Sequence, residues 1–354
     1  MRNKPSRLIK VGIHIRYQRC EAAWIALQLA SWLKNNYIDC SVLSFGKEGQ
    51  NVYPQWDSRI RTDRKLHNLS SWFAEHTHIV WIGDVSKQDV KTAKQAGAKT
   101  VFIVSWDDSY NVRSLYESFD YLITMSPSLR QRLVAEYKNK KIFYIPLHMI
   151  DLAQRQSSHT YRPDKPRVLL NLRNSRSHQL GSKLTPVLKS LFAKHAAEWT
   201  LWVPKSLINK KSWISKAIIQ NQDSSYKLEA SADWDNQRWL YGSHDLMIWP
   251  TLYIGYGLSA IMAQTMGLPV VGFDVPILNE YLVKENSHLI PVQIQYNKSG
   301  IASMSPDLAR LESVVSKILA APQLITKFKK HTGDWSKERY ELYESGWKQV
   351  LNDK

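Results

Sequence analysis

The sequence predicts an α/β protein made of two doubly wound parallel sheets. Two observations support this prediction. Short apolar runs alternate with amphipathic helical runs along most of the chain, which is the pattern of parallel strands joined by helices. The chain also has 354 residues, more than one hydrophobic core usually supports, so we expect two domains of roughly 150 residues each. Ligands of such sheets bind outside the carboxyl ends of the strands, and functional residues are expected in the loops there.

The first half of the chain shows the alternation clearly. An apolar strand over 8–15 precedes a helix over 21–35, whose apolar residues recur at helical spacing, and a second strand over 40–45 follows. The pattern then continues to Pro146, with strands at 79–82, 100–104, 121–124 and 141–145 and helices at 85–96 and 127–137.

A polar stretch over 148–166 separates the two halves and reads as the connection between domains. Beyond it we expect strands at 167–172, 200–203, 246–249 and 270–272, and helices at 183–196, 234–241, 258–266, 307–320 and 323–350. The predicted domains are therefore residues 1–150 and 151–330. Residues 331–354 are expected to form a C-terminal helix that packs back on the first domain.

The chain is strongly basic, with 48 Lys and Arg against 31 Asp and Glu and a net charge of +17. Residues 1–150 contain 22 basic and 13 acidic residues, a net of +9, which leaves +8 for the rest. The excess is thus spread over both halves and is not a basic tail. Such a balance indicates acidic partners: nucleic acid, a nucleotide or an anionic membrane surface.

The two cysteines, Cys20 and Cys40, provide neither a metal set nor a disulfide framework, which favours a reducing cytoplasm. No apolar run approaches the ~18 residues of a membrane span. We therefore expect a soluble cytoplasmic protein that could still sit on a membrane face.

Residues 249–272 (WPTLYIGYGLSAIMAQTMGLPVVG) contain a loop with Gly255 and Gly257 between an apolar strand and an amphipathic run. Glycines before a helix let the backbone approach a ligand closely, and the first amides of the helix attract phosphate. The alternative is an ordinary strand–turn–helix connection, because a lone G-x-G is a weak fingerprint.

Five segments carry motifs in a fixed order along the chain: 126–146, 235–245, 249–258 (WPTLYIGYGL), 266–280 (MGLPVVGFDVPILNE) and 285–292 (ENSHLIPV). The last three resemble P-S-L-Y-E-G-F-G-L, G-L-P-V-V-x-x-D-V-P with a downstream glutamate, and E-N-G-L-L-V-P of the retaining GT-B glycosyltransferases of family 4. The resemblance covers most of the chain. It implies two Rossmann-like domains that face a cleft, with the acceptor bound by the first and a nucleotide sugar by the second.

The sequence departs from the family at several positions. The glutamates of the family's E-x7-E pair, which touch the donor sugar and ribose, are replaced by Ile254 and Met262, which we expect to be core or pocket-wall residues. The family's R-x4-K clamp for the diphosphate is blurred into Arg173 and Arg176, with Lys183 further on.

The resemblance implies a nucleotide-sugar co-substrate, a UDP- or GDP-sugar, and neither a metal nor another cofactor. The expected donor-binding residues are the two arginines and the lysine of the clamp, the glycine loop and the downstream glutamate: Arg173, Arg176, Lys183, Gly255, Tyr256, Gly257 and Glu280. Arg173 and Arg176 follow a strand, where bidentate guanidinium contacts to phosphate are favoured.

An inverting reaction needs a base or an orienting group for the acceptor hydroxyl. Asp107 and Asp84 follow strands of the first sheet, and His14 lies near the end of its first strand. These three residues are our catalytic candidates, and Asp108 is a further one. Each has a structural alternative: Asp84 as the cap of the next helix, and His14 as a core histidine.

The acceptor is expected in the first domain, where basic residues gather in a loop that includes Arg59, Arg61, Arg64 and Lys65 and in a second over 138–141. One hypothesis is a polyanion, hydroxymethylated DNA, as for the phage DNA glycosyltransferases that share the GT-B architecture; the protein would then act in the host cytoplasm. The alternatives are an envelope glycan or glycolipid transferase on an anionic membrane face, and a GT-B protein that binds without catalysis.

Overall fold

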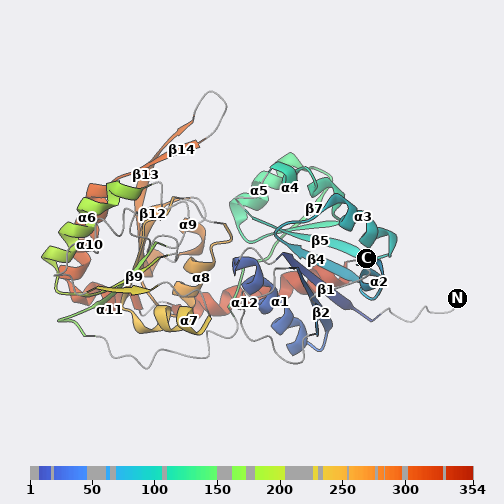
Figure 1. Ribbon diagram of the computed structural model, residues 1–354, viewed down its shortest axis with the longest axis horizontal. Coiled ribbons are helices and arrows are strands. Elements are labelled where there is room, and N and C mark those ends of the chain that lie inside the picture. Colours follow the sequence, from blue (N-terminus) through green and yellow to red (C-terminus); the bar gives the residue numbers. More distant parts are fainter. Residues whose placement is uncertain are drawn as a thin grey trace. The chain divides into compact units, whose positions relative to one another are not determined.

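The computed structural model describes residues 8–16, 20–45, 61–63, 69–105, 110–149, 162–172, 180–203, 226–229, 234–252, 255–275, 278–282, 284–296, 302–329 and 332–353. The chain divides into two compact units, Met1–Ile150 with Glu338–Lys354, and Asp151–Lys337. Each unit contains one sheet with helices on both faces (Figure 1). The prediction of two doubly wound α/β sheets is confirmed.

In the first unit the described strands form a parallel sheet in the order β3-β2-β1-β4-β5-β6-β7. Their bounds are β1 Lys10–Arg16, β2 Asp39–Phe45, β3 Arg61–Asp63, β4 His78–Ile82, β5 Lys99–Val104, β6 Tyr121–Thr124 and β7 Lys141–Tyr144. The strand order reverses between β1 and β4, and the loops that follow these two strands leave the same edge of the sheet. The basic stretch expected as a loop around Arg61 is corrected here, because Arg61–Asp63 pair with β2 as an edge strand.

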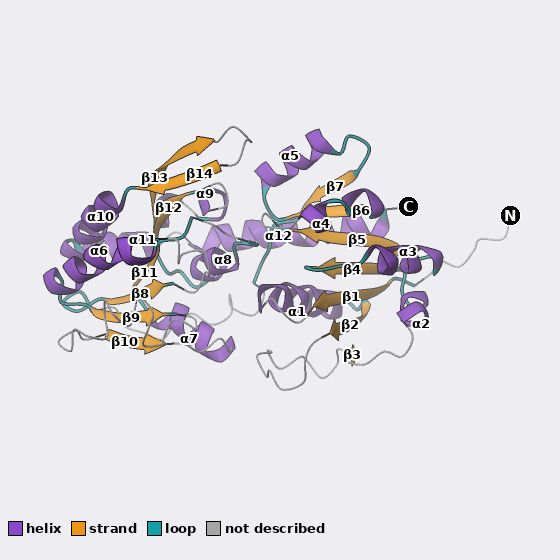
Figure 2. Cartoon of the chain, turned by 45° about the horizontal axis from the view of Figure 1, so that its top comes forward, coloured by secondary structure: helices purple, strands orange, loops and turns teal. Residues whose placement is uncertain are grey.

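Helices cover both faces of this sheet (Figure 2). Their bounds are α1 Cys20–Asn35, α2 Leu69–Ala74, α3 Lys87–Gln95, α4 Tyr110–Arg113, α5 Pro127–Glu136 and α12 Thr332–Asn352, with a 3-10 turn at Tyr116–Ser118. On one face, α1 and α12 meet through the rings of Trp32 and Tyr343, whose centroids are 6.0 Å apart. On the other, side chains of α2, α3 and α5 pack on an aromatic core that includes Trp81 and Phe102.

In the second unit the described strands are ordered β10-β9-β8-β11-β12-β13-β14, parallel except for the pair β13 and β14. The strands are β8 Arg167–Asn171, β9 Glu198–Trp202, β10 Tyr226–Glu229, β11 Leu246–Trp249, β12 Val270–Asp274, β13 Ser287–Tyr296 and β14 Ala302–Pro306. Here the strand order reverses between β8 and β11. The second half of β13 and all of β14 form an antiparallel ribbon, visible beyond the sheet in Figure 1.

The helices of this unit are α6 Gly181–Lys194, α7 Trp234–Ser243, α8 Leu258–Thr265, α9 Leu278–Tyr281, α10 Leu308–Ala320 and α11 Pro322–Lys329, with a 3-10 turn at Lys284–Asn286. The single helix expected over 323–350 is wrong, because α11 ends at Lys329 and α12 begins at Thr332. The boundary between the units falls inside α12, between Lys337 and Glu338.

A glycine sets how closely α12 approaches the first sheet. A Cβ atom at Gly346 would lie 2.8 Å from Cγ1 and 3.2 Å from Cδ1 of Ile145, the residue after β7. Helix propensity alone would favour almost any replacement of a helical glycine. The absence of a side chain at this position is therefore a packing requirement of the helix and the strand end.

We predict that Gly346→Val lowers the free energy of unfolding by about 1–3 kcal/mol, because the added atoms overlap Ile145. Urea denaturation measures this. Ser345→Val, at the exposed neighbouring position, carries the same β-branched side chain without the overlap and should change stability by under about 0.5 kcal/mol. A Gly346→Val protein as stable as wild type would contradict the close packing of α12.

Candidate functional site

The loop after β11 leads directly into α8. Thr251 and Leu252 are buried after the strand end, and Gly255, Tyr256 and Gly257 precede the helix. Gly257 is the N-cap and has φ 73° and ψ 18°, in the left-handed region that side chains disfavour. No side chain caps the helix at this position. Glycine is thus required here for a conformational reason, which the sequence pattern alone did not establish.

The first backbone amides of α8 precede the hydrogen bonds of the helix. The first intrahelical bonds are donated by Ala260 and Ile261 to the carbonyl of Gly257, at 3.0 and 3.2 Å. The amides of Leu258 and Ser259 therefore precede the hydrogen-bonded part of the helix. Such amides carry partial positive charge and suit a phosphate oxygen or another anion.

The other end of α8 is closed by a second glycine. Gly267 has φ 71°, its amide donates to Gln264 O at 3.0 Å, and the amide of Leu268 donates to Ala263 O at 2.8 Å. This is the Schellman arrangement of a helix C-terminus. Two left-handed glycines thus fix both ends of an eight-residue helix.

Met262 is 1% exposed, within a helix whose residues from Ala260 to Gln264 are all buried. The structure therefore places Met262 in the core. Ile254 lies outside the described residues. A carboxylate at position 262 would be a buried charge, which is costly unless it is paired.

Glu280 lies on α9, the short helix that follows β12 and contacts α8. It is half-buried. The turn before it is held by Asn279, whose Nδ2 donates to Asp274 Oδ1 at 2.9 Å. Because β12 neighbours β11, Glu280 and the glycine loop follow adjacent strands at the same edge of the sheet.

The clamp arginines Arg173 and Arg176 lie outside the described part of the chain. They follow β8, which pairs with β11 at the point where the strand order reverses. Lys183 lies in the first turn of α6 and is exposed, its amide donating to Leu180 O at 2.8 Å. The carboxyl ends of β8 and β11 are where ligands of such sheets bind.

The first sheet brings two of the catalytic candidates to its own reversal point. His14 on β1 is opposite Trp81 on β4, is 5% exposed, and its ring centroid is 6.0 Å from that of Trp81. Asp84 follows β4 and is half-buried. The cap of α3 is Ser86, whose Oγ accepts from the amide of Asp89 at 3.1 Å, so the capping role considered for Asp84 is not its role here.

The remaining candidates are not described. Asp107 and Asp108 follow β5, and Arg59, Arg64 and Lys65 flank β3, all outside the described residues. Of Arg61 only the backbone is described, in β3.

His148 was missed by the sequence reasoning, which assigned it to the connection between domains; the structure corrects this. It is 5% exposed in the first unit, and its ring centroid is 5.2 Å from that of Tyr340 on α12. The neighbouring Arg339 donates from Nε to Leu147 O at 3.3 Å. Burial, and then the charge of Arg339, lower the pKa of His148 from 6.5 to about 4. The residues that bury His148 lie far from it in the sequence, so no local pattern around His148 indicates its burial.

An Asp-x-Asp spacing, Asp233 and Asp235, was also overlooked. It lies at the start of α7, where Asp233 is outside the described residues and the side chain of Asp235 is not described. Within the residues that are described, no three His, Cys, Asp or Glu side chains gather closely enough to hold a metal ion.

A buried Ser–His contact in the first unit is structural. Ser41 Oγ is 2.8 Å from His76 Nε2, accepts from Trp72 Nε1 at 3.1 Å, and His76 Nδ1 is 2.7 Å from Trp72 O. Donors and acceptors match around this ring when Nδ1 carries the histidine proton. Both Ser41 and His76 are about 95% buried, at 4% and 5% exposure, away from the carboxyl ends of the strands.

Solved structures share this fold over nearly the whole chain. A glycosyltransferase from Rickettsia africae has a TM-score of 0.69 at 14% identity, with 98% of this chain and 99% of that chain covered. HepE of Anabaena, in complex with UDP and glucose, has a TM-score of 0.68 at 11% identity over 97% and 99%. TarM of S. aureus, in complex with UDP among other ligands, has a TM-score of 0.69 at 10% identity over 98% and 100%. The chain therefore has the GT-B fold.

No protein-family model matches the chain, and no curated protein matches it in sequence. Among the helices that the structure describes, none combines the length and the apolar character needed to cross a membrane.

The lowered pKa of His148 predicts a pH dependence of stability. Between about pH 6.5 and pH 4 the unfolded chain binds a proton at this histidine that the folded protein does not, so stability is full above this window and falls as the pH falls through it. His148→Gln should reduce the loss between pH 7 and pH 4.5 by about 2 kcal/mol, measured by urea denaturation.

His78, whose pKa burial and Lys99 also lower to about 4, keeps its own share of the pH dependence in that variant. Equal losses for wild type and His148→Gln would contradict the buried neutral state of His148.

Proposed function

We propose that the protein is a glycosyltransferase that moves a sugar from a nucleotide-sugar donor to an acceptor hydroxyl. The observation that carries the proposal is the uncapped start of α8: Gly257, with φ 73°, begins a buried helix at the reversal point of the second sheet. In a GT-B fold this is a suitable site for a diphosphate. The likeness to HepE, solved with UDP and glucose, supports the same class of donor.

The chemistry asks for stabilisation of the leaving group. The bond between the anomeric carbon and the diphosphate oxygen breaks, the acceptor oxygen bonds to that carbon, and the hydroxyl proton passes to a base. Charge builds up on the diphosphate as it leaves. The amides of Leu258 and Ser259 are fixed by the buried helix and can meet this charge without reorganisation.

The cations proposed to assist are Arg173 and Arg176 in the loop after β8, and Lys183 on α6. Glu280, on the helix after β12, is proposed to accept hydrogen bonds from donor hydroxyls. Because Met262 is in the core, we propose that backbone amides and arginines hold the donor, rather than a pair of glutamates.

For the acceptor side we propose Asp84 and Asp107 as the groups that orient or deprotonate the hydroxyl. Asp84 follows β4 at the reversal point of the first sheet, and Asp107 follows β5, the strand beside β4. His14, 5% exposed beside Trp81, is a weaker candidate because little of it is open to a substrate.

We propose a polyanionic acceptor, and the support for it is the net charge of +17 spread over both halves of the chain. Hydroxymethylated DNA is the version that we would test first, with Arg59, Arg61, Arg64 and Lys65 as candidate phosphate contacts. An envelope glycan at an anionic membrane face is the alternative.

Gly257→Ala and Gly267→Ala form a matched pair, because both glycines have a positive φ, at opposite ends of α8. Each change should destabilise the protein by about 1–2 kcal/mol. Only Gly257→Ala should also weaken UDP- or GDP-sugar binding, by about tenfold, because its Cβ crowds the diphosphate and the first turn shifts. Calorimetric titration measures donor affinity, and nucleoside diphosphate release measures turnover.

Equal donor affinity in the two variants would show that the start of α8 does not bind the donor. Donor binding without nucleotide release, across a panel of donors and acceptors, would favour the non-catalytic GT-B protein.

The acceptor is tested separately. Hydroxymethylated DNA is incubated with the protein and mixed nucleotide sugars, and its intact mass is then measured. The DNA should gain one sugar mass per modified base. Retention on DNA should fall steeply as salt rises. Retention on anionic vesicles with no effect of DNA would favour the membrane-face alternative.

A further inference from the structure

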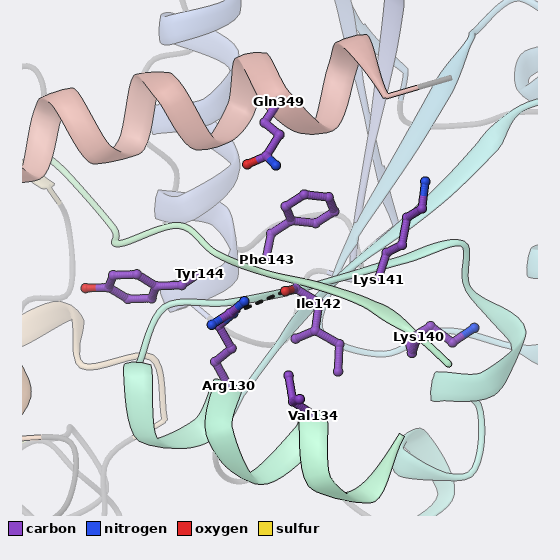
Figure 3. Close-up of a pocket in the computed structure, with 8 residues that line it drawn as sticks. All are labelled: Arg130, Val134, Lys140, Lys141, Ile142, Phe143, Tyr144 and Gln349. Carbon is purple, nitrogen blue, oxygen red and sulfur yellow. Dashed lines mark hydrogen bonds between the residues drawn. The ribbon is translucent and has the colours of Figure 1, made fainter. Parts of the chain in front are cut away.

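A groove runs along the free edge of the first sheet, entirely within the first unit. It is a shallow, open groove with a volume of about 500 Å³, in the range of small-ligand sites. Its lining includes Arg130 and Val134 of α5, Lys140 in the turn before β7, Lys141 and Ile142 of β7, and Gln349 of α12. Figure 3 shows Arg130 and Val134 rising from α5 below the strand and Gln349 descending from α12 above it. We name this the β7 groove.

Arg130 occupies the strand edge. Its Nε donates to the carbonyl of Ile142 at 3.2 Å, the contact drawn in Figure 3. Because β7 is the last of the described strands of this sheet, this carbonyl would otherwise be available to an added strand, and the arginine protects the edge. The groove is therefore poorly suited to an extended peptide. The guanidinium of Arg130 still has the four N–H donors of Nη1 and Nη2.

The lysines of the groove differ in how their charge is balanced. Lys141 Nζ is 2.6 Å from Asp353 Oδ2 and is neutralised. Lys140 Nζ donates to the main-chain carbonyls of Glu117 and Phe119, at 2.9 and 2.6 Å. These bonds hold Lys140 in place without neutralising it, and burial lowers its pKa.

The groove thus retains two positive charges, on Arg130 and Lys140. Within the described residues, neither has a carboxylate at ion-pair distance. The neighbouring Arg132 on α5 differs, because it pairs with Glu136 at 2.8 Å.

An apolar strip separates the two cations. Val134 is 45% exposed and Ile142 is buried, and both lie between Arg130 and Lys140 in Figure 3. A fixed guanidinium fork with free donors matches phosphate oxygens. The strip next to it offers contact to carbon atoms of the same ligand.

We propose that the β7 groove binds a phosphate-bearing organic anion, with the phosphate on the Nη groups of Arg130 and the apolar part on Val134. The positive charge of Lys140, on the other side of Val134, also attracts the anion. The phosphate could belong to a free phosphate ester or to a lipid headgroup, which share this chemistry. The site lies in the first unit and is argued independently of the transfer reaction.

Two probes separate the sources: phenyl phosphate in solution, and vesicles of phosphatidylcholine with and without phosphatidic acid. Calorimetry and co-sedimentation measure binding to the full-length protein. Arg130→Gln should weaken binding about tenfold, the effect of losing one charged hydrogen-bonding group. Its amide can still donate to Ile142 O, so the strand edge stays protected.

Arg132→Gln is the matched control, since it removes the same charge two positions away on the same helix and should change affinity less than about twofold. Val134→Glu is a second variant, at an exposed position that tolerates substitution. Its carboxylate lies one turn from Arg130 and would pair with it, so binding should again fall about tenfold. Thermal unfolding checks that each variant is folded.

A loss confined to Arg130→Gln and Val134→Glu supports the site, and the probe that reports it identifies the source. Equal losses in Arg132→Gln, or no binding of either probe by wild type, would overturn it. Phosphate bound at the loop after β11 would be unaffected by Arg130→Gln, so failure here is distinct from failure of the proposed transferase.

Discussion

The left-handed backbone of Gly257 is the constraint on which the second unit's site depends. With φ 73° it turns the chain from the loop after β11 into α8 without a side-chain cap. The helix that follows is buried from Ala260 to Gln264 and is closed by Gly267, so both of its ends are set by the backbone conformation of a glycine. The amides of the first turn are therefore held at the carboxyl edge of the sheet. Their position comes from packing and backbone conformation, so the proposed phosphate site requires no glutamate at position 262.

The sequence predicted what depends on local periodicity. The helix over 127–137 and the strand over 246–249 have strong apolar patterns, and both were found close to their predicted bounds. Edge strands were missed: β3 has three residues and no apolar core position, and β14 is polar. The inner strand β13 was missed as well. Burial caused by distant contacts was also missed, as for His148, which is covered by residues of α12 almost two hundred positions away. For the candidate site, the sequence pattern located the glycines before α8, and their role in donor binding stays a prediction. The pattern does not determine where the acidic and basic side chains that follow the strands lie.

The basic residues of this chain differ in whether a carboxylate balances their charge. Many cations are paired on the surface: Lys141 with Asp353, Arg132 with Glu136, and Lys194 with Glu312. Exposed pairs of this kind add little stability, but they remove the charge as a feature that a partner can recognise. Arg130 and Lys140 are fixed by main-chain carbonyls, which position a cation and leave its charge in place. This difference, rather than the net charge, is what marks the β7 groove.

The most direct test of the central claim is hydrogen exchange of the backbone amides with and without a UDP- or GDP-sugar. If the start of α8 holds the donor diphosphate, the ligand will slow exchange in the peptide that covers residues 255–261. The C-terminal end of the same helix, around Gly267, should change little, because its amides are already bonded to Gln264 and Ala263. Unchanged exchange in 255–261, under conditions where the nucleotide sugar is bound, would contradict the account.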